Sequence, residues 1–420
     1  MLCLAPLRAL SPVCPVSPIN GYHVRRCDAA TDLRPVHLPT PVRIALISRR
    51  FDAAGGGTER DLLLTAQILA AAGHQVTIYA DEVRSRSDDL AVRHVPALPL
   101  GRALRFLSFA LRVALVARRE GAELVLSFAR AVNADIMRSG GSAHSSYIRA
   151  ARRWQSATAS AAMRLSPYHR AQIALERASF KSQYFRRGIA VSELVRQDLL
   201  KTFALAPSKV LTLYNGVDLK RFAPNRDKSL ARKIRRDFGI PEDWRAVAFV
   251  GHGFARKGLR FLLDAWPQVN SQTCLVVAGT DRTAAAYRSY AMQLGIGDRV
   301  IFIGARADVE RLFAAVDAMA LPSLFEPFGN VVMEAMAAGL PALCSKLTGA
   351  AELIPRELRE LVIDDPTDVG ELARRLNLLL RLGSDASKVA RATAEQYTWQ
   401  RYGTELLEML SGTRLLPDAR

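Results

Sequence analysis

Two glutamates eight positions apart, Glu326 and Glu334, form the most informative pattern in this sequence, LPSLFEPFGNVVMEAMAAGLPAL at 321–343. An apolar run typical of a buried strand precedes Glu326, and Gly329 marks the expected start of a helix that carries Glu334. This order places both carboxylates near the carboxyl end of one strand. The free amides at the helix start are suited to a diphosphate. The alternative is a helix-capping glutamate followed by a glutamate on the helix surface.

A pair of cations, Arg256 and Lys257, lies in GHGFARKGL at 251–259, between an expected strand and an expected helix. Positive charge at a helix start opposes the helix dipole, so an anion-binding role is favoured over two solvated side chains. The segment lacks the GxGxxG spacing, which excludes a dinucleotide site. The chain has no Asp-x-Asp pair, so no metal is expected. Arg256, Lys257 and helix amides would then stabilise a leaving diphosphate.

Apolar runs alternate with helical patterns along the chain, beginning with a strand at 42–48, a helix at 58–73 and a strand at 74–80. The second half repeats this order, so we predict an α/β protein with two doubly wound Rossmann-like domains that face an interdomain cleft. The glycines 55–57 join the first strand to the first helix, where backbone without Cβ atoms can approach a substrate. A flexible turn is the alternative. The expected parts are a disordered extension at 1–41, a first Rossmann-like domain at 42–220, a second at 221–394 and a C-terminal helix at 395–420.

The 420 residues carry a net charge of +18. Residues 101–190 contain 16 Lys and Arg against four acids. These cations lack interleaved aromatics and a nucleic-acid motif, so no nucleic-acid partner is expected, and a membrane surface or a phosphate-rich substrate fits better. Five Cys without a CxxC pair exclude a disulfide scaffold and a zinc site. Residues 1–41 lack the features of a secretory signal, so a cytoplasmic protein is expected.

The Glu326–Glu334 block followed by AAGLP resembles the retaining glycosyltransferases of family 4, which have the GT-B fold. The resemblance runs over about 43–410 and includes GGGTER with GHQVTIY, AVSELVRQDL, VLTLYNGVDLKRFAP and GHGFARKGL. It implies that Glu326 contacts the transferred sugar and Glu334 holds the ribose. It also implies that the domain at 42–220 faces the acceptor, that the domain at 221–394 binds the nucleotide sugar, and that the helix at 395–420 crosses back to the first domain. The donor-binding residues that it implies are Gly56, Gly57, Arg256, Lys257, Phe328, Gly329, Asn330, Val331 and Glu334.

The loop at 133–147 holds two further catalytic candidates, Asp135 and His144. Family members keep a His or an Asp in this loop near the reacting centre. A lone His is also a common structural residue. Glu176, in SPYHRAQIALERASF at 166–180, is expected to be structural, and this segment resembles the lipopolysaccharide-core members in particular.

The resemblance implies a metal-independent hexosyltransferase without a cofactor that takes a sugar nucleotide, with UDP-glucose as the expected donor. The implied acceptor is a lipid-linked anionic glycan, the lipopolysaccharide inner core. The enzyme would be peripheral on an anionic membrane surface, the inner face of the cytoplasmic membrane. Three alternatives stay open: a family member with another donor or acceptor, a GT-B sugar-nucleotide epimerase, and a non-catalytic anion-binding protein.

Overall fold

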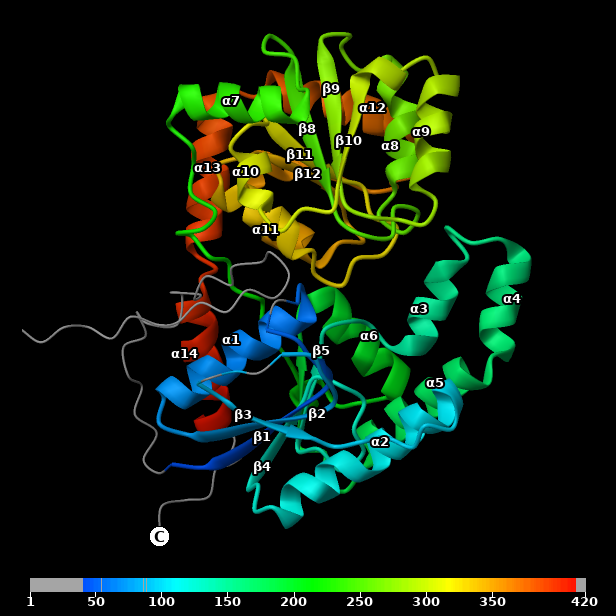
Figure 1. Cartoon of the computed structure of the whole chain (residues 1–420), viewed down its shortest axis with the longest axis vertical. Coiled ribbons are helices and arrows are strands. Elements are labelled where there is room, and N and C mark those ends of the chain that lie inside the picture. The colour runs from blue at the N-terminus through cyan, green and yellow to red at the C-terminus, as the bar shows by residue number, and fades with distance from the viewer. Residues whose placement is uncertain (1–40, 54, 86, 88, 413–420) are drawn as a thin grey trace, which may run out of the picture.

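The computed structural model describes residues 41–412 except 54, 86 and 88 (Figure 1). The expected extension at 1–41 lies outside these residues, apart from its last position. In the described part, two parallel sheets with helices packed around them build two domains, one above the other in Figure 1. The doubly wound prediction is confirmed.

The N-terminal domain is built on a parallel sheet in the order β3-β2-β1-β4-β5-β6-β7. Strand β1, which lies between β2 and β4, reads RIALISRRF, and most of its side chains are buried because helices cover both sheet faces. The strands are β1 Arg43–Phe51, β2 Gln75–Val83, β3 Ala91–His94, β4 Leu124–Ser127, β5 Ile136–Ser139, β6 Arg187–Ala190 and β7 Val210–Thr212. The helices are α1 Thr58–Ala71, α2 Gly101–Arg119, α3 His144–Ala151, α4 Ala157–Leu165, α5 Pro167–Lys181 and α6 Glu193–Phe203.

The C-terminal domain repeats the design with the strand order β10-β9-β8-β11-β12-β13, again all parallel. Its strands are β8 Arg245–Val250, β9 Thr273–Ala278, β10 Val300–Gly304, β11 Ala318–Leu321, β12 Ala342–Ser345 and β13 Val362–Ile363. Its helices are α7 Lys228–Phe238, α8 Leu259–Ala265, α9 Ala284–Gln293, α10 Val309–Phe313, α11 Asn330–Ala337, α12 Val369–Arg381 and α13 Ser384–Glu395.

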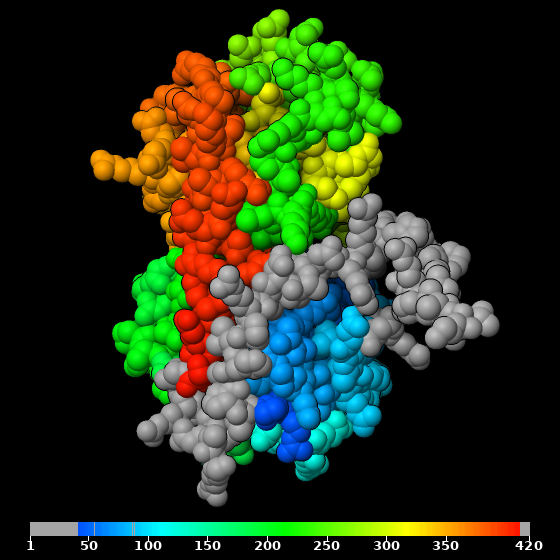
Figure 2. Space-filling view, turned by 90° about the vertical axis from the view of Figure 1, so that its left-hand side faces the viewer, coloured from blue at the N-terminus to red at the C-terminus, as the bar shows by residue number. Residues whose placement is uncertain are grey.

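The chain passes between the domains twice, and the two passages lie side by side at Val217 and Thr398. The amide of Val217 donates to the carbonyl of Tyr397 at 2.8 Å. Gly216 is required here, because a Cβ would lie 2.5 Å from the amide nitrogen of Trp399. After this point α14 (Trp399–Gly412) returns to the N-terminal domain and packs beside α1 (Figures 1 and 2).

One strand lies where the sequence pattern predicts only loop. Residues 136–139 form β5, between β4 and β6. Arg138, the third residue of β5, interrupts the apolar run that would indicate a strand. A guanidinium is rare in a buried strand unless it is paired. Here Nη2 of Arg138 donates to Asp61 of α1 at 3.0 Å, which offsets the cost of burial.

Within the described residues no helix combines the length and the apolar character that a membrane crossing requires.

Candidate active site

Glu326 forms the centre of a charged cluster at the carboxyl edge of the C-terminal sheet. The loop after β11 carries Glu326, and the loop between β8 and α8 carries Arg256 and Lys257. One carboxylate oxygen, Oε2, accepts from Nζ of Lys257 at 2.6 Å and from Nη1 of Arg256 at 2.9 Å. The same Arg256 nitrogen donates to the carbonyl of Phe325 at 2.7 Å, so the guanidinium is fixed against the Glu326 loop.

The side chains of Glu326 and Lys257 are only 13% and 10% exposed. Burial by itself would raise the pKa of Glu326, but the positive charges of Lys257 and Arg256 and their hydrogen bonds bring this pKa below its ordinary value. Glu326 is therefore a carboxylate at neutral pH. Its negative charge also keeps both cations beside the sheet edge.

Two glycines position Lys257 locally. Gly258 adopts a left-handed φ of +80°, and a Cβ there would lie 2.0 Å from the carbonyl oxygen of Pro322. A Cβ on Gly251 would lie 2.4 Å from Cε of Lys257. The glycines of GHGFARKGL therefore allow the lysine side chain to fold back along its own loop toward Glu326.

Glu334 lies on α11, where it faces the N-terminal domain. Its Oε1 contacts Nη1 of Arg60 at 3.3 Å, and Arg60 also lies 3.8 Å from Asp218. Burial raises the pKa of Glu334, and the charge of Arg60 opposes this rise. Arg60 therefore links the second glutamate of the pattern to the first turn of α1 in the other domain.

The start of α11 has no side-chain cap within the described part of the chain. Gly329 precedes the helix with a φ of +90°, and no described side chain caps the amides of Asn330 and Val331. Phe328 is buried and does not contribute exposed surface. The side chain of Asn330 is held by Asn215, which lies just before the chain passes between the domains. Oδ1 of Asn330 accepts from Nδ2 of Asn215 at 2.9 Å.

In the N-terminal domain, Gly56 and Gly57 have more space around them than Gly251 and Gly258 have. A Cβ on Gly56 or Gly57 would meet no atom within 4 Å, and Gly57 has a left-handed φ of +56° before α1 begins. Protein packing therefore does not demand the absence of side chains at these positions. Three residues after Gly57, Arg60 contacts Glu334, which brings this loop to the same domain interface.

His144 begins α3, which follows the carboxyl end of β5. Its Nε2 shares a 2.8 Å hydrogen bond with Nδ1 of His169, and its backbone amide donates to Glu176 at 2.7 Å. Burial, with the nearby charge of Arg130, lowers the pKa of His144 to about 3. His144 is thus neutral at pH 7. Glu176, paired with Arg130 at 2.7 Å, has the structural role expected of it.

The structure does not bring Asp135 to this cluster. Asp135 precedes β5 at the amino edge of the sheet, where its Oδ2 accepts from the amide of Val125 and from Arg118 at 2.8 and 2.9 Å. The four residues of β5 separate it from the carboxyl edge by about 13 Å. We therefore remove Asp135 from the catalytic candidates. The sequence pattern placed it with His144 because β5 went unrecognised.

Two polar residues that the pattern left unassigned, Arg60 and Asn215, contact the C-terminal domain. Asp61 and Arg138 hold Asn215 from within the N-terminal domain. Asn215 donates to Asp61 at 3.1 Å and accepts from Arg138 at 2.7 Å. Burial of Arg138 and Asp61 makes these bonds costly to break. GGGTER contains Arg60 and YNGVD contains Asn215, so these motifs were the available signal for those two residues, whereas no motif marked Arg138. Among the described residues, no group of three or more His, Cys, Asp or Glu side chains is arranged to hold a metal ion.

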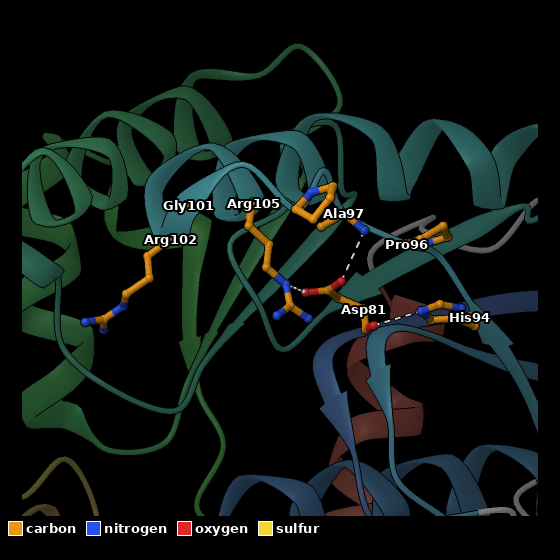
Figure 3. Close-up of a pocket in the computed structure, with 8 residues that line it drawn as sticks. Asp81, His94, Pro96, Ala97, Gly101, Arg102 and Arg105 are labelled. Carbon is orange, nitrogen blue, oxygen red and sulfur yellow. Dashed lines mark hydrogen bonds and ion pairs between the residues drawn. The ribbon is translucent and has the colours of Figure 1, made fainter.

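A pocket of about 500 Å³ lies elsewhere on the N-terminal domain, beside β2, β3 and the start of α2 (Figure 3). Its cations are already engaged within the protein. Arg105 pairs with Asp81 at 2.9 Å, and Arg102 lies 4.7 Å from the ring centre of Tyr168. We do not include this pocket in the candidate site.

Two doubly wound parallel-sheet domains, with the charged cluster where they meet, define the GT-B class of folds. The comparisons then identify the family. The model of Glycosyltransferase Family 4 matches residues 55–221, and that of Glycosyl transferases group 1 matches residues 231–396. The chain therefore belongs to the glycosyltransferases that these two family models describe, and it has the GT-B fold.

An uncharacterized glycosyltransferase of Methanocaldococcus jannaschii is 32% identical over 174 residues, 40% of this chain and 45% of that protein. The chain spans about half the length of most of the curated relatives it matches. The structure is similar to WaaG, a glycosyltransferase involved in lipopolysaccharide biosynthesis, with a TM-score of 0.74, 22% identity, and 88% and 100% of the two chains covered. The structure is also similar to Anabaena Alr3699/HepE in complex with UDP-glucose, with a TM-score of 0.66 and 19% identity. This match covers 88% of this chain and 100% of that one.

Proposed function

We propose that this protein transfers a hexose from a nucleotide diphosphate sugar to an acceptor hydroxyl, with retention at the anomeric carbon. The observation that carries the proposal is the Glu326 carboxylate between Lys257 and Arg256, beside the uncapped start of α11. The amides and the two cations suit a diphosphate, and the carboxylate suits sugar hydroxyls. Glu334, on the same helix, suits the ribose hydroxyls.

In the proposed reaction the bond from the anomeric carbon to the phosphate oxygen breaks, and the acceptor oxygen forms its bond to that carbon on the same face, which retains the configuration. The acceptor proton passes to the departing phosphate. Arg256, Lys257 and the α11 amides offset the charge that develops on the diphosphate, which makes a metal ion unnecessary. A carboxylate held by two cations is a weak nucleophile, so Glu326 orients the sugar and stabilises its positive charge without a covalent bond.

UDP-glucose is the proposed donor, and a lipid-linked anionic glycan such as the lipopolysaccharide inner core is the proposed acceptor. The likeness to the HepE complex with UDP-glucose supports the donor, and the likeness to WaaG supports the acceptor. The charge of residues 101–190 supports an anionic acceptor at a membrane. Along α2, Leu104, Leu111 and Leu115 are 52%, 48% and 39% exposed, so we propose that this helix meets an anionic bilayer.

The test compares the wild-type protein with Glu326→Ala. Uridine, guanosine and adenosine diphosphate sugars are screened for donor hydrolysis and transfer, and the anomeric configuration of the product is determined by NMR. We expect the variant to lose at least 100-fold in turnover, as is typical for loss of a charge-stabilising group.

The same variant should bind the nucleotide diphosphate with undiminished affinity, because Arg256 and Lys257 lose their carboxylate partner and stay available to phosphate. Lys257→Met is the matched comparison and should weaken binding in titration calorimetry. Near-normal turnover of Glu326→Ala would contradict the proposed role, and formation of an epimerised sugar nucleotide without acceptor would contradict transfer.

A further inference from the structure

Three aromatic side chains from the two domains meet directly beside Glu326. The ring centre of Phe325 lies 5.8 Å from that of Tyr147 and 6.4 Å from that of Trp154. Tyr147 and Trp154 lie 6.0 Å apart, so the three rings form one cluster, which we call the aromatic platform. Tyr147 comes from α3, Trp154 from the turn after it, and Phe325 from the loop that carries Glu326.

The aromatic platform is not part of a buried core. All three residues remain partly exposed, whereas the large core aromatics Phe249 and Phe254 are fully buried. Phe325 turns toward α3, while its neighbour Glu326 faces Arg256 and Lys257. Because consecutive Cα atoms are about 3.8 Å apart, the platform adjoins the reacting groups on their acceptor-domain side.

Cations surround the platform on the N-terminal side. Arg149, Arg152 and Arg153 are exposed, and the segment 144–154 contains no acid. Nη2 of Arg149 donates to Ser146 at 2.7 Å, and Arg153 approaches the carbonyl of Leu324 at 3.5 Å. An apolar aromatic surface beside exposed arginines favours a ligand that is both ring-shaped and anionic.

We propose that Tyr147, Trp154 and Phe325 bind a pyranose ring of the acceptor glycan, with the α3 arginines on its phosphate or carboxylate groups. This inference rests on the proposed function and identifies the acceptor side of the same site. The C–H face of a pyranose packs on an aromatic ring, and its hydroxyls stay at the wet edge. The acceptor hydroxyl is thereby held near the sugar that Glu326 orients.

The competing explanation is that the rings only clamp the two domains together. A clamp would act on donor and acceptor alike, because both need the assembled interface. An acceptor subsite acts on the acceptor alone. The variants Tyr147→Ala and Trp154→Ala separate these explanations, with Trp154→Phe to restore an aromatic ring and Leu165→Ala, at a 75% exposed leucine, as the surface control.

The probe is a phosphorylated core oligosaccharide freed of lipid, together with its dephosphorylated form. Saturation-transfer NMR measures binding, and kinetics give separate KM values for oligosaccharide and UDP-glucose. We expect Trp154→Ala and Tyr147→Ala to raise the KM of the oligosaccharide about 10-fold or more, as loss of one stacking ring does elsewhere. The KM of UDP-glucose and the rate of its hydrolysis without acceptor should stay within twofold of wild type, and Trp154→Phe should recover most of the loss.

Equal changes in both KM values, an unchanged oligosaccharide KM, or no binding of the oligosaccharide to wild-type protein would each overturn the inference. Loss of selectivity for the phosphorylated form in Arg153→Ala would support the role of the arginines. Donor hydrolysis is the readout that keeps the two proposals apart. A wild-type protein that hydrolyses no sugar nucleotide fails the proposed function, whereas one that hydrolyses a donor but ignores the platform variants fails only this inference.

Discussion

Individual charges at the domain interface depend on partners that are distant in the sequence. Glu326 accepts hydrogen bonds from two cations and has a lowered pKa, whereas burial raises the pKa of Glu334 although Arg60 and Arg221 act against that rise. The two glutamates of the pattern therefore have different electrostatic surroundings. The carboxylate beside the proposed sugar is strongly held in its charged form, and that beside the proposed ribose has its direct charged contact, Arg60, in the other domain.

Replacing Arg60 by Gln should make nucleotide affinity more sensitive to acid. Without its cation the pKa of the buried Glu334 rises further, so protonation begins at a higher pH and the carboxylate loses an acceptor for ribose hydroxyls. Calorimetric titration of UDP between pH 5.5 and 8 should show affinity falling earlier in the variant as pH decreases. Superimposable profiles for the variant and wild type would refute the coupling.

His144 should make the fold sensitive to acid. Its pKa of about 3 in the folded chain lies below the ordinary value of 6.5, so the unfolded state binds more protons between these values. The free energy of unfolding therefore falls as pH drops below about 6.5, by up to about 1.4 kcal/mol per pH unit for one such group. Urea unfolding from pH 7 to 5 should show a shallower dependence for His144→Gln. An equal slope in both proteins would contradict this assignment.

At the scale of elements, a helix of one domain is capped by the other. Glu352, in the short 3-10 segment Gly349–Leu353, accepts the amides of Glu193 and Leu194 at the start of α6, at 2.8 and 2.6 Å. It also accepts from the hydroxyl of Tyr214 at 3.0 Å. A carboxylate at a helix start is favoured by the helix dipole, so α6 and this segment hold the domains together.

Glu352→Gln should weaken this contact while leaving each domain folded. Loss of the charge at the helix start should destabilise the contact between the domains by about 1 kcal/mol or less, because the site is exposed to solvent. Small-angle X-ray scattering should show a larger radius of gyration than in wild type, with unchanged circular dichroism. Glu357→Gln is the control, because this glutamate is exposed and lies outside the contact. Identical scattering from all three proteins would exclude the domain-holding role.

For the whole molecule, the unequal distribution of charge and exposed leucine suggests an orientation at a surface. The N-terminal domain carries the basic segment 101–190 and the exposed leucines of α2, and it also contributes two rings of the aromatic platform. A bilayer on this side would present a lipid-linked acceptor to the domain interface while the C-terminal domain takes the donor.

Binding to vesicles with anionic lipid should weaken as salt rises, because screening shortens the reach of surface charge to about 8 Å at 0.15 M. Leu111→Asn should lower vesicle binding in a sedimentation assay, since it removes apolar area from the face of α2. Leu230→Asn, on a 43% exposed leucine of α7, is the matched change in the other domain. Equal loss in both variants, or binding unaffected by salt, would contradict the orientation.

The two doubly wound domains, the Glu326–Glu334 block and the cations of GHGFARKGL could all be predicted from the order of the residues. These features depend on the order of residues within short segments, where apolar periodicity, glycine positions and helix starts act locally. The order of the residues also accounts for the family resemblance, because the same local blocks carry it.

The contacts between side chains of the two domains could be seen only in the folded chain. Arg60 and Glu334 are 274 positions apart, and Tyr147 and Phe325 pack together from different domains. Asp135 and His144 lie nine positions apart, yet β5 sends them to opposite edges of a sheet. No local pattern encodes such contacts, because they arise when two independently patterned domains dock and bury charges that must then find partners.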